Sequence, residues 1–221
     1  MHLAIFAKYW AAGEAKTRLA ASFGPWAASR VARALLKTTV NRLAAVHATR
    51  HLVIVPEYSR RAFEGIARGR FQVALQGPGA LGERLQRWFE NRFANGASRV
   101  VVLGADSPDL PLEYVATAFA ELECHSAVIG PARDGGYYLL GLRARTLPLF
   151  DGIDWGTPAV FEQTLDRLRQ SDATFAVLPT WHDIDTAEDL KLLCRELRAS
   201  ARPDPACERL LRTILRVTGI G

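Results

Sequence analysis

The stretch VVVLGADSPDLP, residues 100–111, gives the strongest indication of the fold, and the rest of the sequence agrees with it. Three valines and a leucine form a short apolar run rich in β-branched residues, which favours a buried strand over 100–103. Two carboxylates, Asp106 and Asp109, come directly after this run. In an open sheet of parallel strands, ligands bind at the carboxyl ends of the strands. The stretch therefore predicts a central strand and the edge at which functional residues gather.

Strand-like and helix-like patterns alternate on both sides of this stretch. Strands separated by helices indicate one α/β domain over residues 1–200, with a doubly wound, mostly parallel sheet flanked by helices. A C-terminal helical extension is expected over 201–221. Thr186 and Asp189 predict a capping box at the start of one helix. The other predicted strands are 3–7, 52–55, 71–75, 127–130, 137–142 and 175–178, and the predicted helices are 26–47, 59–68, 81–93, 111–122, 158–169, 186–198 and 204–217.

The composition limits the classes of function. The net charge of +5 suits phosphorylated ligands, nucleic acid or an anionic surface. The arginines are scattered and no basic stripe carries interleaved aromatics, so we expect no nucleic-acid partner. No apolar run reaches the roughly 20 residues of a membrane span, and the first residues lack the basic region of a signal peptide. The sequence therefore predicts a cytoplasmic protein without a membrane span.

The stretch FAKYWAAGEAKTRLA, residues 6–20, carries three cations at the expected carboxyl end of the first strand. Lys8, Lys16 and Arg18, together with backbone amides, would suit a phosphate group. The stretch is not a Walker loop, because Ala15 stands where that motif requires a glycine. A surface loop with solvated cations is an equally good interpretation of the charge alone.

Asp106 and Asp185 are candidate ligands for a divalent cation. Magnesium is often bound by one or two carboxylates together with substrate phosphates, and Asp185 could complete a site begun by Asp106. The alternative for each aspartate is turn formation or compensation of a helix dipole. Asp109 fits that alternative well. Asp106 fits it less well because it lies closer to the strand end.

The turn Asp134-Gly135-Gly136 separates two predicted strands. Two glycines allow an unusual backbone and a close approach to a ligand, whereas Asp-Gly is also a strong hairpin signal. The pattern alone favours the hairpin. A hydrolase triad of Ser107, Asp134 and His182 has the right chain order, but the sequence lacks the GxSxG elbow that such enzymes use.

Five segments together resemble a known family. The order of these segments resembles that of a bacterial family of small nucleotide-diphospho-sugar transferases with the glycosyltransferase-A fold, some of which are linked by name to arsenosugar biosynthesis. More distantly, the chain is similar to nucleotidyltransferases that make phospholactyl-guanosine and molybdenum-cofactor dinucleotides. The matching segments are FAK…GEAKTRL, QGPGALGERL, GADSPDLP, ARDGGYYLLGL and DIDTAEDL, and the match covers roughly residues 2–198.

This resemblance implies roles for individual residues. Asp134, Gly135 and Gly136 would face the second substrate, and Asp106 and Asp185 would hold Mg²⁺ or Mn²⁺. The chain departs from the usual family loop at Glu14, which places a negative charge where a basic residue is common. The implied nucleotide-binding residues are Lys8, Gly13, Lys16, Thr17, Arg18, Gln76 and Gly82, and the implied catalytic residues are Lys16, Arg18 and Asp106.

The expected activity is metal-dependent glycosyl transfer from a nucleoside-diphosphate sugar to a small-molecule acceptor. One alternative is nucleotidyl transfer from a nucleoside triphosphate, which releases pyrophosphate. An alternative of another class is a nucleotide-binding protein without turnover. The sequence identifies neither the base, the sugar nor the acceptor.

Overall fold

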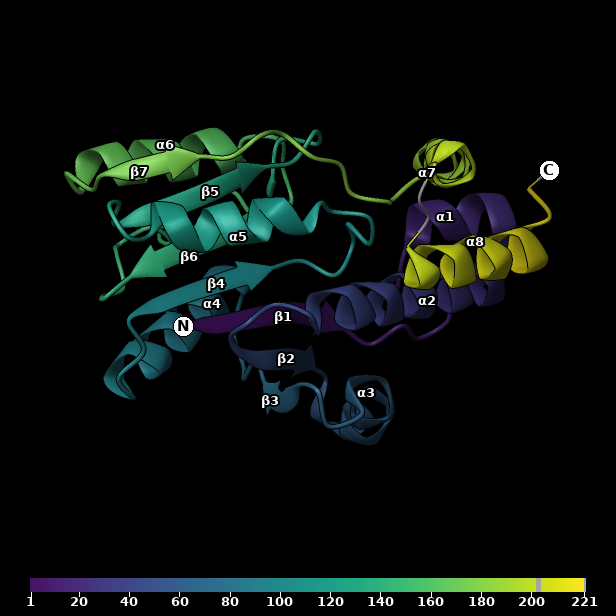
Figure 1. Cartoon of the computed structure of the whole chain (residues 1–221), viewed down its shortest axis with the longest axis horizontal. Helices are drawn as coiled ribbons and strands as arrows, with labels where there is room; N and C mark the ends of the chain where they lie inside the picture. Colours follow the sequence, from purple (N-terminus) through teal and green to yellow (C-terminus); the bar gives the residue numbers. More distant parts are fainter. Residues whose placement is uncertain (202–203, 221) are drawn as a thin grey trace.

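A sheet of seven strands, in the order β3-β2-β1-β4-β6-β5-β7, forms the centre of the protein (Figure 1). The structure is a computed structural model that describes residues 1–201 and 204–220. Every predicted strand is present in it, which confirms the α/β class. The strands are β1 (His2–Lys8), β2 (Thr49–Val55), β3 (Gln72–Leu75), β4 (Arg99–Leu103), β5 (Ala127–Pro131), β6 (Tyr137–Arg143) and β7 (Phe175–Val177).

The sheet is mostly parallel, as predicted, with β6 as the strand that runs the other way. It pairs antiparallel with both β4 and β5, whereas the other neighbouring strands pair in parallel. The turn at 132–136 joins β5 to β6 as a hairpin, which the Asp-Gly pair favours. This hairpin turn therefore lies at the edge of the sheet where the parallel strands end.

Helices cover both faces of the sheet. α2, α3 and α5 pack on one face and α4 and α6 on the other. The bounds of the helices are α1 (Thr17–Phe23), α2 (Pro25–Leu43), α3 (Arg60–Ala67), α4 (Leu81–Ala94), α5 (Leu112–Glu121), α6 (Val160–Gln170), α7 (Ala187–Ala199) and α8 (Pro205–Thr218), with a 3-10 turn at Glu57–Ser59. Among these, α1 is the helix that the sequence patterns did not predict.

Side chains alternate between the two faces along β1, as expected for a strand buried on both sides. Leu3 and Ile5 pack in the core beneath α2, α3 and α5, and Ala4 packs in the core beneath α4 and α6. All three are fully buried. β1 is therefore covered by helices on both of its faces.

A third core lies beyond the ends of the strands, among α1, α2, α7 and α8. Figure 1 shows α8 beside α2, and the two helices contact each other along their lengths. The predicted extension over 201–221 contains α8, while its residues 202, 203 and 221 lie outside the described residues. No helix in the described part of the chain is long and apolar enough to cross a membrane.

Candidate active site

A cleft of about 320 Å³ opens where the chain leaves β1. The parallel pairing of β1 with β4 brings the carboxyl ends of these two strands to the same edge of the sheet. The segment before α7 reaches this edge as well, because the Ile184 amide donates to the Asp106 carbonyl oxygen at 3.0 Å. Six predicted site residues line the cleft together: Lys8, Lys16, Thr17, Arg18, Asp106 and Asp185.

Lys16 lies at the centre of this arrangement. Its Nζ is 2.7 Å from Asp106 Oδ1 and 2.5 Å from Asp185 Oδ1, and its side chain is only 8% exposed. Burial disfavours the charge on Lys16, but Asp106 and Asp185 outweigh burial and raise the lysine pKa. The ammonium is therefore charged at neutral pH. It forms ion pairs with both acids that the sequence assigned to a metal and neutralises one of their two negative charges.

The backbone of Lys16 is in the left-handed region, with φ of 51° and ψ of 53°. A non-glycine residue pays roughly 1–2 kcal/mol for this conformation, so other contacts must stabilise it here. The two ion pairs of the side chain supply such contacts, because they hold the lysine at the turn from the loop into α1. The unusual backbone thus occurs at the residue that forms ion pairs with both acids of the cleft.

Glu14 does not take up the cations of the loop. It is exposed, and among the described residues it forms no ion pair with Lys16 or Arg18. Its carbonyl oxygen accepts a long hydrogen bond of 3.5 Å from Lys8 Nζ. Arg18 is exposed and borders both the cleft and a neighbouring hollow. Lys8 and Arg18 are therefore accessible to an anionic ligand even though the loop contains Glu14.

The position of Asp185 is set by the start of α7. Thr186 caps this helix by accepting a hydrogen bond from the Asp189 amide, and Asp189 Oδ2 accepts from the amides of Asp185 and Thr186. The predicted capping box is thus confirmed. It fixes the backbone on which the Asp185 carboxylate stands, so that this carboxylate points toward Lys16.

The donor set of Asp106 and Asp185 fits a hard divalent cation. One oxygen from each carboxylate converges on a single point, where the cationic Nζ of Lys16 lies. Both side chains are about half exposed, at 45% and 41%, so further ligands could reach them from substrate or solvent. Lys16 would have to move from this point for an ion to lie between the two carboxylates.

Asp183 is a third acid at this edge, with a different environment. Ser107 Oγ donates to Asp183 Oδ1 at 2.5 Å. Burial raises the Asp183 pKa to about 6, although the Ser107 hydrogen bond opposes this rise. Because the folded-state pKa lies above the unfolded value, this carboxyl contributes most stability at low pH. The contribution is lost as the pH rises toward and through about 6.

Replacing Ser107 by Ala is expected to raise the Asp183 pKa above about 6, because the carboxylate then loses the hydroxyl that stabilises its charged form. A titration of the Asp183 carboxyl carbon by NMR in chelator-treated protein measures this. Ser171→Ala is the control, since the Ser171 hydroxyl donates to the Leu168 carbonyl instead. An unchanged or lower Asp183 pKa in Ser107→Ala would contradict the expectation.

The structure does not bring Ser107, Asp134 and His182 together as a hydrolase triad. Ser107 donates to Asp183, and His182 Nε2 lies 3.1 Å from Asp109 Oδ2. Asp134 Oδ1 accepts from the Gly136 amide at 2.9 Å, which is the bond of an ordinary turn. The structure therefore gives no support to a serine hydrolase.

The turn at Asp134-Gly135-Gly136 borders the hollow next to the cleft, through Asp134. Gly135 has a φ of 89°, and a Cβ there would lie 2.2 Å from the Pro158 carbonyl oxygen. The Gly135 carbonyl also accepts a hydrogen bond of 2.9 Å from the Phe161 amide at the start of α6. Close packing against the segment before α6 is thus sufficient reason for this glycine.

Gly135→Ala is expected to lower the free energy of unfolding by at least about 1 kcal/mol, because a side chain is strained at this φ and meets backbone atoms. Urea unfolding measures the change. Gly136→Ala is the matched control: its nearest contact would be Asp134 Oδ1 at 3.2 Å and its φ lies outside the left-handed region. Equal losses in both variants would contradict the assignment of the strain to Gly135.

Gln76 and Gly82 lie outside the lining of the cleft. Gln76 Nε2 donates to the carbonyl oxygens of Ala7 and Val53, at 3.2 and 3.1 Å, and its Oε1 accepts from Arg84. A Cβ on Gly82 would lie 2.8 Å from Trp155 Nε1. In this structure Gln76 ties the glycine-rich turn to β1 and β2, Gly82 packs against Trp155, and their implied nucleotide-binding role stays a prediction.

The chain matches a known protein family. Residues 38–157 match the family described as "Uncharacterized protein conserved in bacteria (DUF2064)". The chain belongs to the DUF2064 family. The match includes the central strand β4, the acids that follow it and the β5–β6 hairpin of this DUF2064 protein. No curated protein matches the sequence significantly.

Solved structures share the fold of this chain. A candidate nucleotide-diphospho-sugar transferase from Desulfovibrio desulfuricans G20 is 34% identical over 98% of this chain and 97% of the other, with a TM-score of 0.88. A cytidylyltransferase from Leptospira borgpetersenii is 15% identical over 99% and 95% of the two chains, with a TM-score of 0.56. The inositol-1-phosphate CTP transferase of T. maritima is 13% identical over 97% and 96%, with a TM-score of 0.54. The fold of this DUF2064 protein is therefore that of the nucleotide-diphospho-sugar transferases.

Proposed function

We propose that the protein is a metal-dependent glycosyltransferase that uses a nucleoside-diphosphate sugar as donor. The observation that carries this proposal is the convergence of Asp106 and Asp185 on one point beside the cations Lys8, Lys16 and Arg18. Paired carboxylates for a cation next to side chains for phosphate form the chemistry that a diphosphate leaving group needs. The assignment of the relative from Desulfovibrio desulfuricans G20 supports the same class of substrate.

In the proposed reaction, an acceptor hydroxyl attacks the anomeric carbon of the donor sugar. The bond from that carbon to the diphosphate oxygen breaks, and the hydroxyl proton is lost to base or solvent. Mg²⁺ or Mn²⁺, when held by Asp106 and Asp185, supplies charge neutralisation to the phosphate oxygens. Lys16 and Arg18 would donate hydrogen bonds to the same diphosphate and stabilise its developing charge.

Lys16 has two possible sets of partners in this proposal. In the structure its ammonium pairs with Asp106 and Asp185 and neutralises one of their two negative charges before ligand binds. With a cation held by Asp106 and Asp185, the ammonium of Lys16 would be free to donate hydrogen bonds to phosphate. Its flexible stem of four carbons allows such a movement.

Nucleotidyl transfer is the second candidate. Three cations around the connection from β1 to α1, Lys8, Lys16 and Arg18, are enough to contact a triphosphate, which is the donor that releases pyrophosphate. The cytidylyltransferase and the CTP transferase that share the fold act on such nucleotides by their descriptions. The two candidates differ in their products, so one assay separates them.

The deciding experiment incubates the protein with nucleotide sugars or nucleoside triphosphates, a divalent cation and a panel of acceptors. Glycosyl transfer is expected to release a nucleoside diphosphate, which ³¹P NMR distinguishes from pyrophosphate. Pyrophosphate released from GTP or CTP would overturn the first proposal in favour of the second. Metal-dependent binding of a nucleotide without any product across the panel would instead support a nucleotide-binding protein.

A thermal-shift screen with and without Mn²⁺ chooses the nucleotides for that assay. A ligand that binds the folded protein at 100 times its Kd adds about 2.7 kcal/mol of stability. For a chain of this size we expect an increase in Tm of roughly 5–10 °C. The increase should need nucleotide and Mn²⁺ together, because the carboxylates and the phosphates share the cation.

A further inference from the structure

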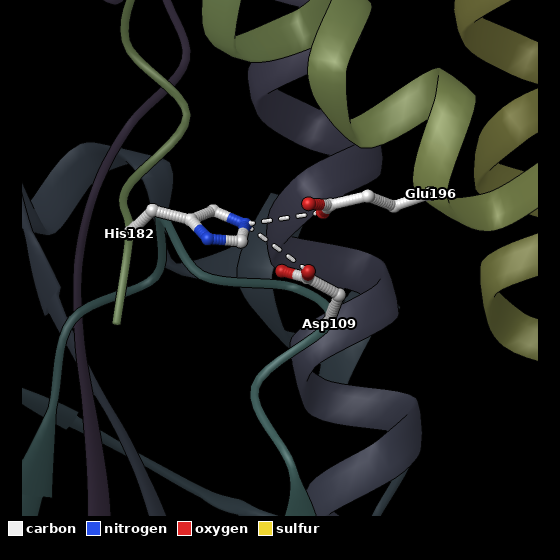
Figure 2. Close-up of side chains that lie close together, drawn as sticks. All are labelled: Asp109, His182 and Glu196. Carbon is white, nitrogen blue, oxygen red and sulfur yellow. Dashed lines mark ion pairs between the residues drawn. The ribbon is translucent and has the colours of Figure 1, made fainter. Parts of the chain in front are cut away.

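A second cluster of ligating side chains lies outside the cleft. Asp109, His182 and Glu196 point toward one another from the loop after β4, the segment before α7 and α7 itself (Figure 2). His182 Nε2 is 3.1 Å from Asp109 Oδ2 and 3.9 Å from Glu196 Oε2. One ligand atom from each residue lies within 4.8 Å of the other two.

The burial of this cluster demands a partner for its polar atoms. The side chains of His182 and Asp109 are only 8% and 12% exposed. In the part of the chain that the structure describes, His182 Nδ1 and Asp109 Oδ1 have no hydrogen-bond partner, and the partners of His182 Nε2 are the carboxylates of Asp109 and Glu196. The Trp181 ring stacks on the imidazole, with centroids 4.8 Å apart, and so fixes the orientation of the ring. Buried polar atoms in this state are uncommon, and each needs an explanation.

We propose that Asp109, His182 and Glu196 bind a divalent transition-metal ion of the zinc class. One imidazole nitrogen and two carboxylates make a mixed donor set that suits zinc, whereas magnesium takes oxygen ligands. The bond lengths of tetrahedral zinc place its ligand atoms about 3.3–3.5 Å apart. The 3.1 and 3.9 Å separations lie on either side of this value.

The exposure of Glu196 fits this assignment. Its side chain is 46% exposed, so it can move the short distance that closes the site. The same opening gives solvent access to the ion, and a water molecule can supply the fourth ligand. The cluster thus has one buried ligand, His182, one largely buried ligand, Asp109, and one adjustable ligand at the surface, Glu196.

The proposed zinc site would stabilise the cleft by joining the two segments that carry Asp106 and Asp185. Asp109 follows Asp106 by three residues, and His182 precedes Asp185 by three residues. One ion on Asp109 and His182 would therefore join the two segments that carry the acids of the cleft, and Glu196 would anchor both segments to α7. The bound ion is a positioning element, distinct from the Mg²⁺ or Mn²⁺ of the proposed reaction.

A proton and a zinc ion would compete for the imidazole of His182. Asp109 raises the His182 pKa above its usual 6.5 against the effect of burial, with Glu196 adding to the rise and Arg133 opposing it. Asp189 also faces the ring. If a proton is the only occupant, the stability from this ion pair is lost as the pH rises through the His182 pKa. If zinc is the occupant, its stabilisation grows over the same range, because the metal needs the neutral imidazole.

The test uses the full-length protein after treatment with a chelator. Calorimetric titration with ZnCl₂ in the presence of millimolar MgCl₂ is expected to show one zinc site. Glu196→Gln should weaken zinc binding at least about tenfold. Glu188→Gln is the matched control, because Glu188 is exposed on the same helix and outside the cluster. Asp106→Asn should leave zinc binding intact.

His182→Gln removes the nitrogen ligand and should abolish zinc binding. If this buried substitution prevents folding, Glu196→Gln still decides the question, since Glu196 lies at the surface. Equal zinc affinity in Glu196→Gln and the unmodified protein would overturn the proposal. Loss of zinc binding in Asp106→Asn would place the ion in the cleft instead. Absence of zinc binding, with a Tm that falls as the pH rises through the His182 pKa, would assign the cluster to a proton.

Discussion

Replacing Asp106 by Asn is expected to abolish metal-dependent nucleotide binding while the protein stays folded. The substitution removes one of the two carboxylates that converge on a single point, and a neutral amide is a far weaker ligand for Mg²⁺. The fold should survive because the Asp106 side chain is 45% exposed and the buried ammonium of Lys16 keeps its ion pair with Asp185. The Asp106 carbonyl keeps its hydrogen bond from the Ile184 amide.

Titration calorimetry with the nucleotide found in the thermal-shift screen measures this loss, in buffer with and without Mg²⁺. Asp166→Asn on α6 is the control, because Asp166 is an exposed acid that pairs only with Arg169 among the described residues. A nucleotide affinity that is unchanged in Asp106→Asn would remove Asp106 from the metal site. Circular dichroism checks that the variant is folded.

Replacing Lys16 by Met is expected to weaken nucleotide binding by about 10- to 150-fold. Methionine keeps an apolar stem in the buried position and removes the charge. The expected factor corresponds to about 1.5–3 kcal/mol for one hydrogen bond to a charged group. Lys16 is 8% exposed, so solvent screens its contacts little. The measurement is again the affinity for nucleotide in the presence of Mg²⁺.

The same variant reports on the dual pairing of Lys16. Without nucleotide, Lys16→Met should bind Mg²⁺ more tightly than the unmodified protein, because the ammonium no longer lies between Asp106 and Asp185. Lys37→Met, a change at an exposed position of α2, is the control. A loss of nucleotide affinity below about 0.5 kcal/mol would leave Lys16 as a structural ion pair only.

The fold could be predicted because its signals are local. An apolar run such as 100–103 marks a strand wherever it lies in a sheet, and Thr186 and Asp189 lie close enough in sequence to reveal their capping box. The chain leaves each parallel strand at the same edge, so the residues that follow the strands could be grouped without coordinates. Lys16, Asp106 and Asp185 were brought together by this argument, and they do meet.

Features that depend on distant partners could not be predicted in this way. The seven-residue α1 has no side-chain cap, and the left-handed Lys16 before it has no signature in the sequence. The sequence assigned Lys16 to phosphate and the acids to metal, but only the coordinates place the lysine between the acids. The cluster of Asp109, His182 and Glu196 joins three segments, and no spacing along the chain marks it.

The helices that follow the site residues Lys16 and Asp185 belong to the third core. α1 begins directly after Lys16, α7 begins shortly after Asp185, and both pack their apolar faces with α2 and α8. None of the described residues of α8 lines the cleft. A chain cut before α8 would nevertheless leave α1 and α7 without part of their common support, and the acids and the lysine would lose their alignment. The shortest fragment that binds nucleotide should therefore extend to about Thr218.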